Sequence, residues 1–272
     1  MAPTSVPSTN APPTNAVTPA VVVPRLPGTP VLGKDGLYLF TGGGLELTVD
    51  PRRASVVRLS LDGKDALLPA DAPPGDYTAE VEGSSLLVTS PTLGVSKRFR
   101  LDTARRSVEV ACTLTNRTKE VVRTAAASQL RVPSAGGLTL FPGAHKLGPN
   151  STLRLNVWQP VVWFPHDEAR EPKLLEASVE STEGWVASVN QGLLLVMVAA
   201  EAAKPVIHIA SGYDASSKLR PWVEVVARSE LELGPGTSET RNARLFLRRL
   251  PVEISAKPGN QELVGFVRGV IQ

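Results

Sequence analysis

Residues 95–118, VSKRFRLDTARRSVEVACTLTNRT, alternate apolar and polar side chains on both sides of a short polar stretch. Successive side chains of a strand point to opposite faces, so this segment predicts a β-hairpin that turns near residues 102–105 and ends at Asn116. In its second strand Cys112 falls on the same side as Val110 and its apolar neighbours. This position favours a buried structural thiol over a nucleophile.

The same pattern continues through most of the chain beyond residue 33, as short alternating runs separated by Gly, Pro, Asp and Asn. Asp-Gly at 62–63 and Gly-Ser at 83–84 are typical two-residue hairpin turns. Many short strands at a spacing of about ten residues predict a sandwich or a barrel, since alternating β and α units would show helical periods. Helix-like spacing occurs only near the end of the chain, at Leu263, Phe266, Val267 and Val270.

Composition divides the chain into three parts. Residues 1–30 are rich in Pro, Thr, Ser, Asn and Ala with almost no charge, which predicts a disordered leader. We expect one folded β domain over 31–250 and a C-terminal appendage over 251–272 that contains a short helix. A leader of this kind is frequent ahead of exported domains, which slightly favours the periplasm or cell envelope over the cytoplasm. An artefact of cloning or of the start site explains it equally well.

Charge and composition narrow the function classes. The 272 residues are 42% hydrophobic and 20% charged, with a net charge of +3 that is scattered along the chain. These values are typical of a globular protein, and the basic stripe with interleaved aromatics that favours nucleic acid is missing. No apolar run reaches the roughly 18 residues that predict a membrane span. We therefore expect no nucleic-acid partner and no membrane insertion.

Motifs for cofactor chemistry are absent from the sequence. It contains no G-x-S-x-G elbow, no phosphate-binding loop and no dinucleotide fingerprint after a strand. Its three histidines are dispersed and lack the ligand spacing of a metal site. The sequence therefore predicts no metal and no cofactor.

A second stretch, RPWVEVVARSELELGPG at 220–236, predicts the ligand-binding face. Trp222 and Glu224 fall on one face of this strand, while Val223 and Val225 fall on the other. An aromatic ring offers a flat apolar surface to a sugar, and a carboxylate accepts hydrogen bonds from hydroxyls. This pairing favours a carbohydrate ligand. The alternatives are a solvated carboxylate paired with a neighbour and a tryptophan that packs at the sheet edge.

The densest aromatic segment is NVWQPVVWFPHDE at 156–168. Its two prolines predict an edge strand or a loop, because proline cannot donate to a sheet ladder. Loops on a rigid scaffold often bind ligands, so Trp158, Trp163 and His166 are candidate ligand-binding residues. The equal alternative is a loop that folds these rings onto the core.

Three segments in order resemble galactose-mutarotase-like (aldose 1-epimerase-like) proteins: residues 44–69 with their LSLDG hairpin, 108–142 with LTNRT, and 221–251 with a late acid-bearing strand before LGPG. The second segment is more similar to an uncharacterised bacterial family, in which an arginine, a proline and a glycine-rich turn follow. Arg131 matches that arginine. The resemblance implies a β-supersandwich of two large antiparallel sheets whose concave face binds sugars.

The resemblance also implies a chemistry, in which a glutamate acts as the base on the anomeric hydroxyl and a histidine as the acid on the ring oxygen. Glu224 matches the glutamate. The expected Asn-His pair is missing, since this chain has AAASQ at 125–129. His145 and His208 are then the candidate acids, although neither has the neighbours of the family's histidines.

These observations predict a carbohydrate-binding protein that contacts a mono- or oligosaccharide through Trp222, Arg131, Trp158, Trp163 and His166. A sugar epimerase with Glu224 as its base is the alternative, so the sequence leaves catalysis open. A third alternative is a structural or protein-interaction module, because a fold does not dictate a function.

Overall fold

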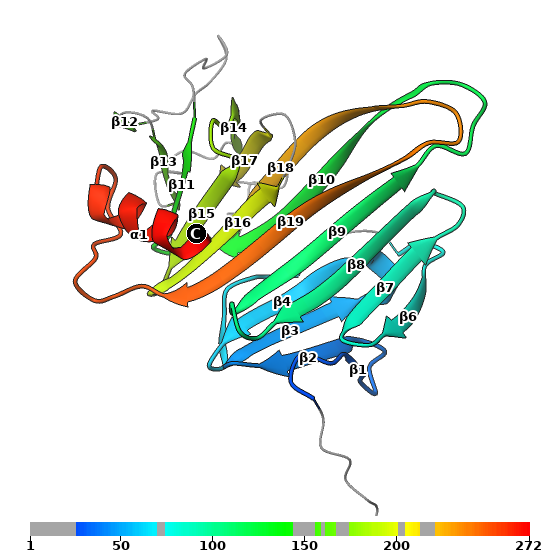
Figure 1. Ribbon diagram of the computed structural model, residues 1–272. Helices are drawn as coiled ribbons and strands as arrows, with labels where there is room; N and C mark the ends of the chain where they lie inside the picture. Colours follow the sequence, from blue (N-terminus) through cyan, green and yellow to red (C-terminus); the bar gives the residue numbers. More distant parts are fainter. Residues whose placement is uncertain are drawn as a thin grey trace, which may run out of the picture.

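The computed structural model describes residues 26–69, 74–143, 156–158, 161–166, 174–200, 205–212 and 221–272. Most of the predicted leader, residues 1–25, lies outside these ranges, and so does His145. The described chain forms three antiparallel sheets and one α-helix (Figure 1). The all-β prediction is confirmed.

The three sheets differ in size. The five-stranded sheet has the order β1 (Val31–Leu32), β2 (Tyr38–Gly42), β3 (Leu45–Asp50), β4 (Ser55–Leu61) and β5 (Lys64–Asp65), with a 3-10 turn η1 (Pro51–Arg53) after β3. The four-stranded sheet has the order β10 (Val122–Pro133), β18 (Trp222–Leu233), β17 (Val206–Gly212) and β14 (Leu174–Glu180). The ten-stranded sheet has the order β12 (Asn156–Trp158), β13 (Val161–Pro165), β11 (Leu138–Pro142), β15 (Trp185–Asn190), β16 (Leu193–Ala200), β19 (Ser238–Arg249), β9 (Ser107–Thr115), β8 (Val95–Asp102), β7 (Ser85–Ser90) and β6 (Thr78–Glu82).

One core joins all three sheets. Leu47 of β3, Val223 of β18 and Leu247 of β19 are all fully buried in the same apolar cluster. The ten-stranded sheet therefore packs against the other two, which adjoin where the amide of Leu68 donates to the carbonyl of Arg131 at 2.8 Å. Burial of alternate side chains from facing sheets is the main source of stability in such a sandwich.

Local turn chemistry sets the predicted hairpins. Asp62 and Gly63 connect β4 to β5 with φ of 51° and 78°, as a type I′ turn requires. Two residues, including Gly83 at φ 59°, connect β6 to β7. The 95–118 segment forms β8 and β9, paired from Asp102 opposite Ser107 outward.

Asn116, directly after β9, hydrogen-bonds to both the β9–β10 and the β18–β19 connections. Its side-chain amide donates to the carbonyls of Glu120 at 2.7 Å and Leu233 at 2.9 Å, and its Oδ1 accepts from the amide of Thr118 at 2.9 Å. Its backbone also bonds to the β18–β19 turn, at Gly236 and Thr237. The asparagine of the LTNRT motif therefore holds the β9–β10 and β18–β19 connections side by side.

The aromatic segment differs from the prediction. Its second half forms β13, which lies between β12 and β11, so the prediction of an edge strand or loop is wrong for residues 161–165. Proline is tolerated because Pro160 precedes the strand and Pro165 is its last residue, where neither interrupts the ladder.

Helix α1 (Gln261–Ile271) covers part of the outer face of the ten-stranded sheet (Figure 1). Asn260 caps its first turn by accepting from the amide of Glu262 at 3.0 Å. Leu263, Val264 and Val267 are buried in a second apolar cluster that includes Trp163. The helix therefore completes a core that the sheet alone would leave in water.

We expect Leu263→Ala to lower the free energy of unfolding by about 2–5 kcal/mol, because it leaves a cavity in this second cluster. Leu93→Ala is the matched control, since Leu93 is 59% exposed and its truncation should cost within about 0.5 kcal/mol. Urea denaturation of both variants tests the packing of α1. Equal losses would show that the helix does not contribute.

The helix is also held by an ion pair. Arg268 donates to Glu183 through Nη2 at 2.5 Å and Nε at 3.1 Å, and the Trp185 indole donates to the same carboxylate at 3.0 Å. These bonds, chiefly those from Arg268, hold the pKa of Glu183 below its usual range against the opposing effect of burial.

A lowered folded-state pKa means that Glu183 contributes stability above its unfolded pKa of about 4.3, and that this contribution is lost as pH falls through the folded value. We expect the stability difference between the parent protein and Arg268→Gln to shrink as pH falls from 7 towards 3. Urea midpoints across that range measure it. A difference that is independent of pH would contradict the role of this pair.

Candidate functional site

The outer face of the four-stranded sheet carries the residues that the sequence analysis singled out on β18. Val223 and Val225 are buried in the shared core, whereas Trp222, Glu224 and Val226 alternate with them and are partly exposed. The predicted side-chain alternation of this strand is confirmed. Trp222 and Glu224 therefore point away from the core together.

Arg131 of β10 lies directly opposite Glu224 in the antiparallel pair. Its Nε is 3.7 Å from Glu224 Oε2, and the two side chains are only 12% and 22% exposed. That distance exceeds an ordinary hydrogen bond, while the low exposure limits screening by water. The face therefore holds an arginine–carboxylate pair that is close and largely withdrawn from solvent.

The indole of Trp222 completes this group. The Arg131 guanidinium carbon lies 4.6 Å from the centre of the ring, in a cation–π arrangement. One flat side of the indole is thus occupied by the arginine, which the sequence analysis did not anticipate. The indole Nε1 is buried and donates no hydrogen bond within the described chain.

His208 of β17 lies on the same face. Its neighbours Ile207 and Ile209 are buried in the core, so its side chain points outward. Its Nδ1 is 2.9 Å from the hydroxyl of Ser178, and its Nε2 has no hydrogen-bond partner within the described part of the chain. Ser178 thus orients the ring through Nδ1.

The sheet register relates His208 to Glu224. His208 is opposite Val226 and Glu224 is opposite Ala210, so the two polar residues are diagonal neighbours on one face. Diagonal neighbours of an antiparallel pair are roughly 7–8 Å apart. Gln129 of β10 is opposite Val226 on the other side and is exposed. The sequence did not identify Gln129 and Ser178 as neighbours of this site, because their positions depend on the pairing of strands that are distant in the chain.

The described side chains of the aromatic segment are buried rather than on this face. Trp163 is fully buried beneath α1, and His166 is also buried, in contact with β11. His166 Nε2 lies 2.8 Å from the Thr139 hydroxyl, and its Nδ1 lies 3.3 Å from the Pro133 carbonyl. His166 therefore links β11 of the ten-stranded sheet to the end of β10 in the four-stranded sheet.

The side chains of two further candidates are not described. His145 lies outside the described residues, and of Trp158 only the backbone in β12 is described. Trp222, Glu224, Arg131 and His208 are therefore the predicted residues that the structure brings together.

Cys112 lines the space between the sheets, where Lys97 lies beside it. Burial raises the pKa of its thiol, with the positive charge of Lys97 acting in the opposite direction. A thiol kept protonated in this way is a poor nucleophile.

Within the ranges that the structure describes, no three His, Cys, Asp or Glu side chains gather where they could hold a metal ion. The same ranges contain no helix of the length and apolarity that crossing a membrane requires.

Comparison with known proteins places the fold. No family model and no curated protein matches the sequence. Solved structures do match: a candidate aldose 1-epimerase from Escherichia coli K12 has 12% identity and a TM-score of 0.61, over 79% of this chain and 99% of that one. A galactose mutarotase-like protein from Lactobacillus casei has 11% identity and a TM-score of 0.58, over 78% and 100% of the two chains.

A TPR-domain containing protein from Parabacteroides distasonis is also similar, with 15% identity and a TM-score of 0.59, over 82% of this chain and 49% of that longer one. Identities this low show the fold alone. The chain has the galactose-mutarotase-like β-sandwich fold that its sequence motifs predicted.

The Arg131–Glu224 pair gives a direct test of the site's electrostatics. We expect Arg131→Gln and Glu224→Gln each to lower the free energy of unfolding by about 1–3 kcal/mol, because each removes one charge of a poorly solvated pair. The double variant should lose less than the sum of the two.

Arg123→Gln is the matched control, since Arg123 pairs with Glu232 across the same two strands but is 85% exposed. An exposed pair should contribute less than about 1 kcal/mol. Chemical denaturation of all four variants measures the difference. Losses in the site variants no larger than in the control would contradict an energetic role for the pair.

Proposed function

We propose that the outer face of the four-stranded sheet binds a carbohydrate, with Arg131, Trp222 and Glu224 as its contact residues. The observation that carries this proposal is the grouping of Arg131, Glu224 and the Trp222 indole on one face of the sheet. A guanidinium donates hydrogen bonds and a carboxylate accepts them, so the two together match a sugar hydroxyl, which does both.

The wider face supports the same ligand class. Gln129 and His208 extend the polar surface on either side of β18. Trp222 holds the guanidinium in position through one ring face, and its remaining surface is apolar, as the C–H groups of a sugar require. The fold is also that of a protein from Lactobacillus casei described as galactose mutarotase-like.

Sugar epimerisation is the second candidate, and the diagonal placement of Glu224 and His208 favours it. In this mechanism Glu224 takes the proton of the anomeric hydroxyl, the ring opens, and His208 Nε2 gives a proton to the ring oxygen. Closure of the ring on the other face of the aldehyde then reverses both proton transfers. The absent Asn-His pair makes binding without catalysis our first choice.

Binding is tested with the full chain by calorimetry against a panel of neutral hexoses, pentoses and uronic acids, after a glycan array. We expect at least one saccharide to bind, and Trp222→Ala and Glu224→Gln to weaken it roughly tenfold, equivalent to about 1.4 kcal/mol. Arg123→Gln should bind as the parent does. Circular dichroism confirms that each variant is folded.

A folded parent protein that binds no saccharide would overturn the proposal. Anomer interconversion, followed by NMR, separates the two candidates: catalysis requires that Glu224→Gln and His208→Gln both slow it. Rates equal to the parent's would remove the epimerase and leave the binding site.

A further inference from the structure

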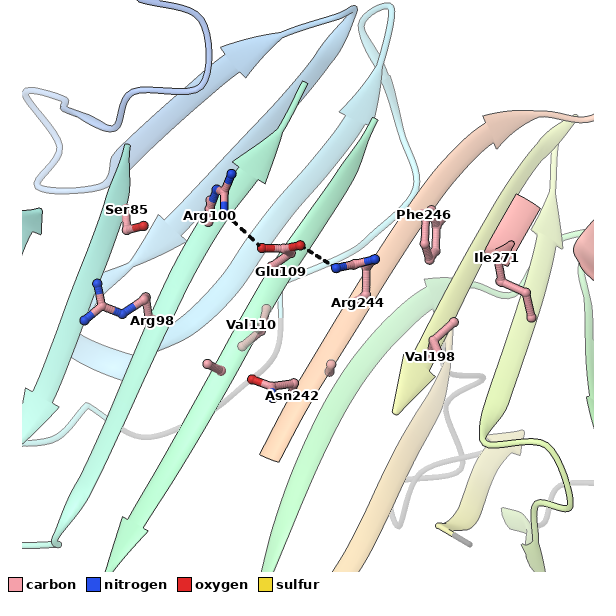
Figure 2. Close-up of a pocket in the computed structure, with 12 residues that line it drawn as sticks. Ser85, Arg98, Arg100, Glu109, Val110, Val198, Asn242, Arg244, Phe246 and Ile271 are labelled. Atoms are coloured by element: carbon pink, nitrogen blue, oxygen red, sulfur yellow. Dashed lines mark hydrogen bonds and ion pairs between the residues drawn. The ribbon is translucent and has the colours of Figure 1, made fainter. Parts of the chain in front are cut away.

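The side of the molecule opposite the Glu224 face carries a hollow with a polar and an apolar part. On β8 and β19, Phe99 and Leu245 face the shared core, so the alternating residues Arg100 and Arg244 face outward from the ten-stranded sheet. There they line a hollow of about 500 Å³ (Figure 2). The shared core separates this hollow from the face that carries Glu224.

Its polar side is rich in arginine. Arg98, Arg100 and Arg244 line the hollow together with one carboxylate, Glu109 of β9. Register places Glu109 between Arg100 and Arg244, and Figure 2 shows the three side chains in one row. Arg98 pairs with Glu82 through Nη1 at 2.5 Å, so Arg100 and Arg244 are the two guanidinium groups that face Glu109.

Glu109 lies much closer to Arg244 than to Arg100. Arg244 Nη2 lies 2.6 Å from Glu109 Oε1, whereas Arg100 Nη1 lies 3.6 Å from Oε2. The Arg100 guanidinium makes no hydrogen bond to the described residues, and the side chain is 53% exposed. Its donors are therefore available to a ligand, and guanidinium groups bind carboxylate and phosphate oxygens in preference to neutral groups.

The other side of the hollow is apolar. Val198 of β16, Phe246 of β19 and Ile271 at the end of α1 form it, and Figure 2 shows them grouped across from Arg100. The Phe246 ring lies between two guanidinium carbons, 6.0 Å from that of Arg244 and 5.8 Å from that of Arg248. The basic and apolar parts therefore adjoin at Phe246.

More positive charge lies near this end of the hollow. Arg248 donates to the carbonyls of Arg105 and Arg106 at 2.6 and 2.7 Å. Burial, and then the positive charge of Arg106, lower the pKa of Arg248. These neighbours add to the attraction that the hollow exerts on an anion.

We propose that this hollow binds a small ligand that carries an oxyanion on an apolar body. The oxyanion, a carboxylate or a phosphate, is held by Arg100 and Arg244 and competes with Glu109 for them. The apolar body packs against Phe246, Val198 and Ile271. This site is separate from the proposed carbohydrate face and does not depend on it.

Titration of the full chain with phenyl phosphate, benzoate and neutral benzyl alcohol, followed by NMR, tests the proposal. We expect saturable binding of at least one of the two anions and none of the alcohol. Arg100→Gln should weaken the bound anion roughly tenfold, as loss of a charge-assisted bond implies. Arg123→Gln and Glu224→Gln are controls that should leave it unchanged.

Glu109→Gln distinguishes a binding site from a structural ion network. A competing carboxylate weakens anion binding, so its removal should tighten the bound anion several-fold. If Glu109 served only to order Arg100 and Arg244, the same change would weaken binding or leave it unaltered, and the proposed site would be wrong.

The apolar half is tested by Ile271→Ala, which should weaken phenyl phosphate and leave inorganic phosphate unaffected. The preferred probe among phenyl phosphate and benzoate identifies the oxyanion. Absence of saturable binding by both anions would overturn the proposal, and so would equal losses in Arg100→Gln and Arg123→Gln. Inorganic phosphate that binds as tightly as phenyl phosphate would rule out the apolar body.

Discussion

The structure depends on one core that receives every second side chain from strands of all three sheets. Val223 and Val225 of β18 enter it from one side, and Leu245 and Leu247 of β19 enter it from the other. The period of two is fixed by strand geometry, and a slip of one residue would expose the whole apolar set. Because the core fixes the inward residues, it also determines which polar residues face outward on each side of the molecule.

The two outer faces therefore differ in chemistry although they obey the same rule. The main contrast is in the arginines: Arg131 is 12% exposed beside a carboxylate that is 22% exposed, whereas Arg100 is 53% exposed beside a carboxylate that is 30% exposed. Two unit charges about 4 Å apart attract by about 4 kcal/mol at an effective dielectric constant near 20, and by about 1 kcal/mol in bulk water. The pair on the four-stranded sheet is accordingly suited to a rigid, preorganised contact, whereas the exposed Arg100 is the arginine of the ten-stranded sheet that is least constrained by its carboxylate.

Sequence reasoning succeeded where the determinants are local. The Asp62-Gly63 turn and the direction of Glu224 follow from a few neighbouring residues. It failed where a side chain meets a distant one. Trp163 is covered by α1, and the Trp222 ring by Arg131, which reaches it through the pairing of β10 with β18. The arginine hollow was missed for another reason. The sequence shows that Arg100 and Arg244 alternate with apolar residues, but only the pairing of β8 and β19 with β9 places them beside Glu109.

The residues that carry the family resemblance also explain why it predicts the fold better than the activity. Asn116 of the LTNRT motif is buried and uses its amide to join two chain connections, so the motif preserves architecture. The Asn-His pair that the resemblance implies beyond it is absent from β10, where Ala125 and Ala127 are followed on the same face by Gln129 and Arg131. Alanine cannot transfer a proton, so within the described strands an acid for Glu224 has to come from another strand. The proposed epimerisation takes its acid from His208 of β17, whose Nδ1 lies 2.9 Å from the Ser178 hydroxyl.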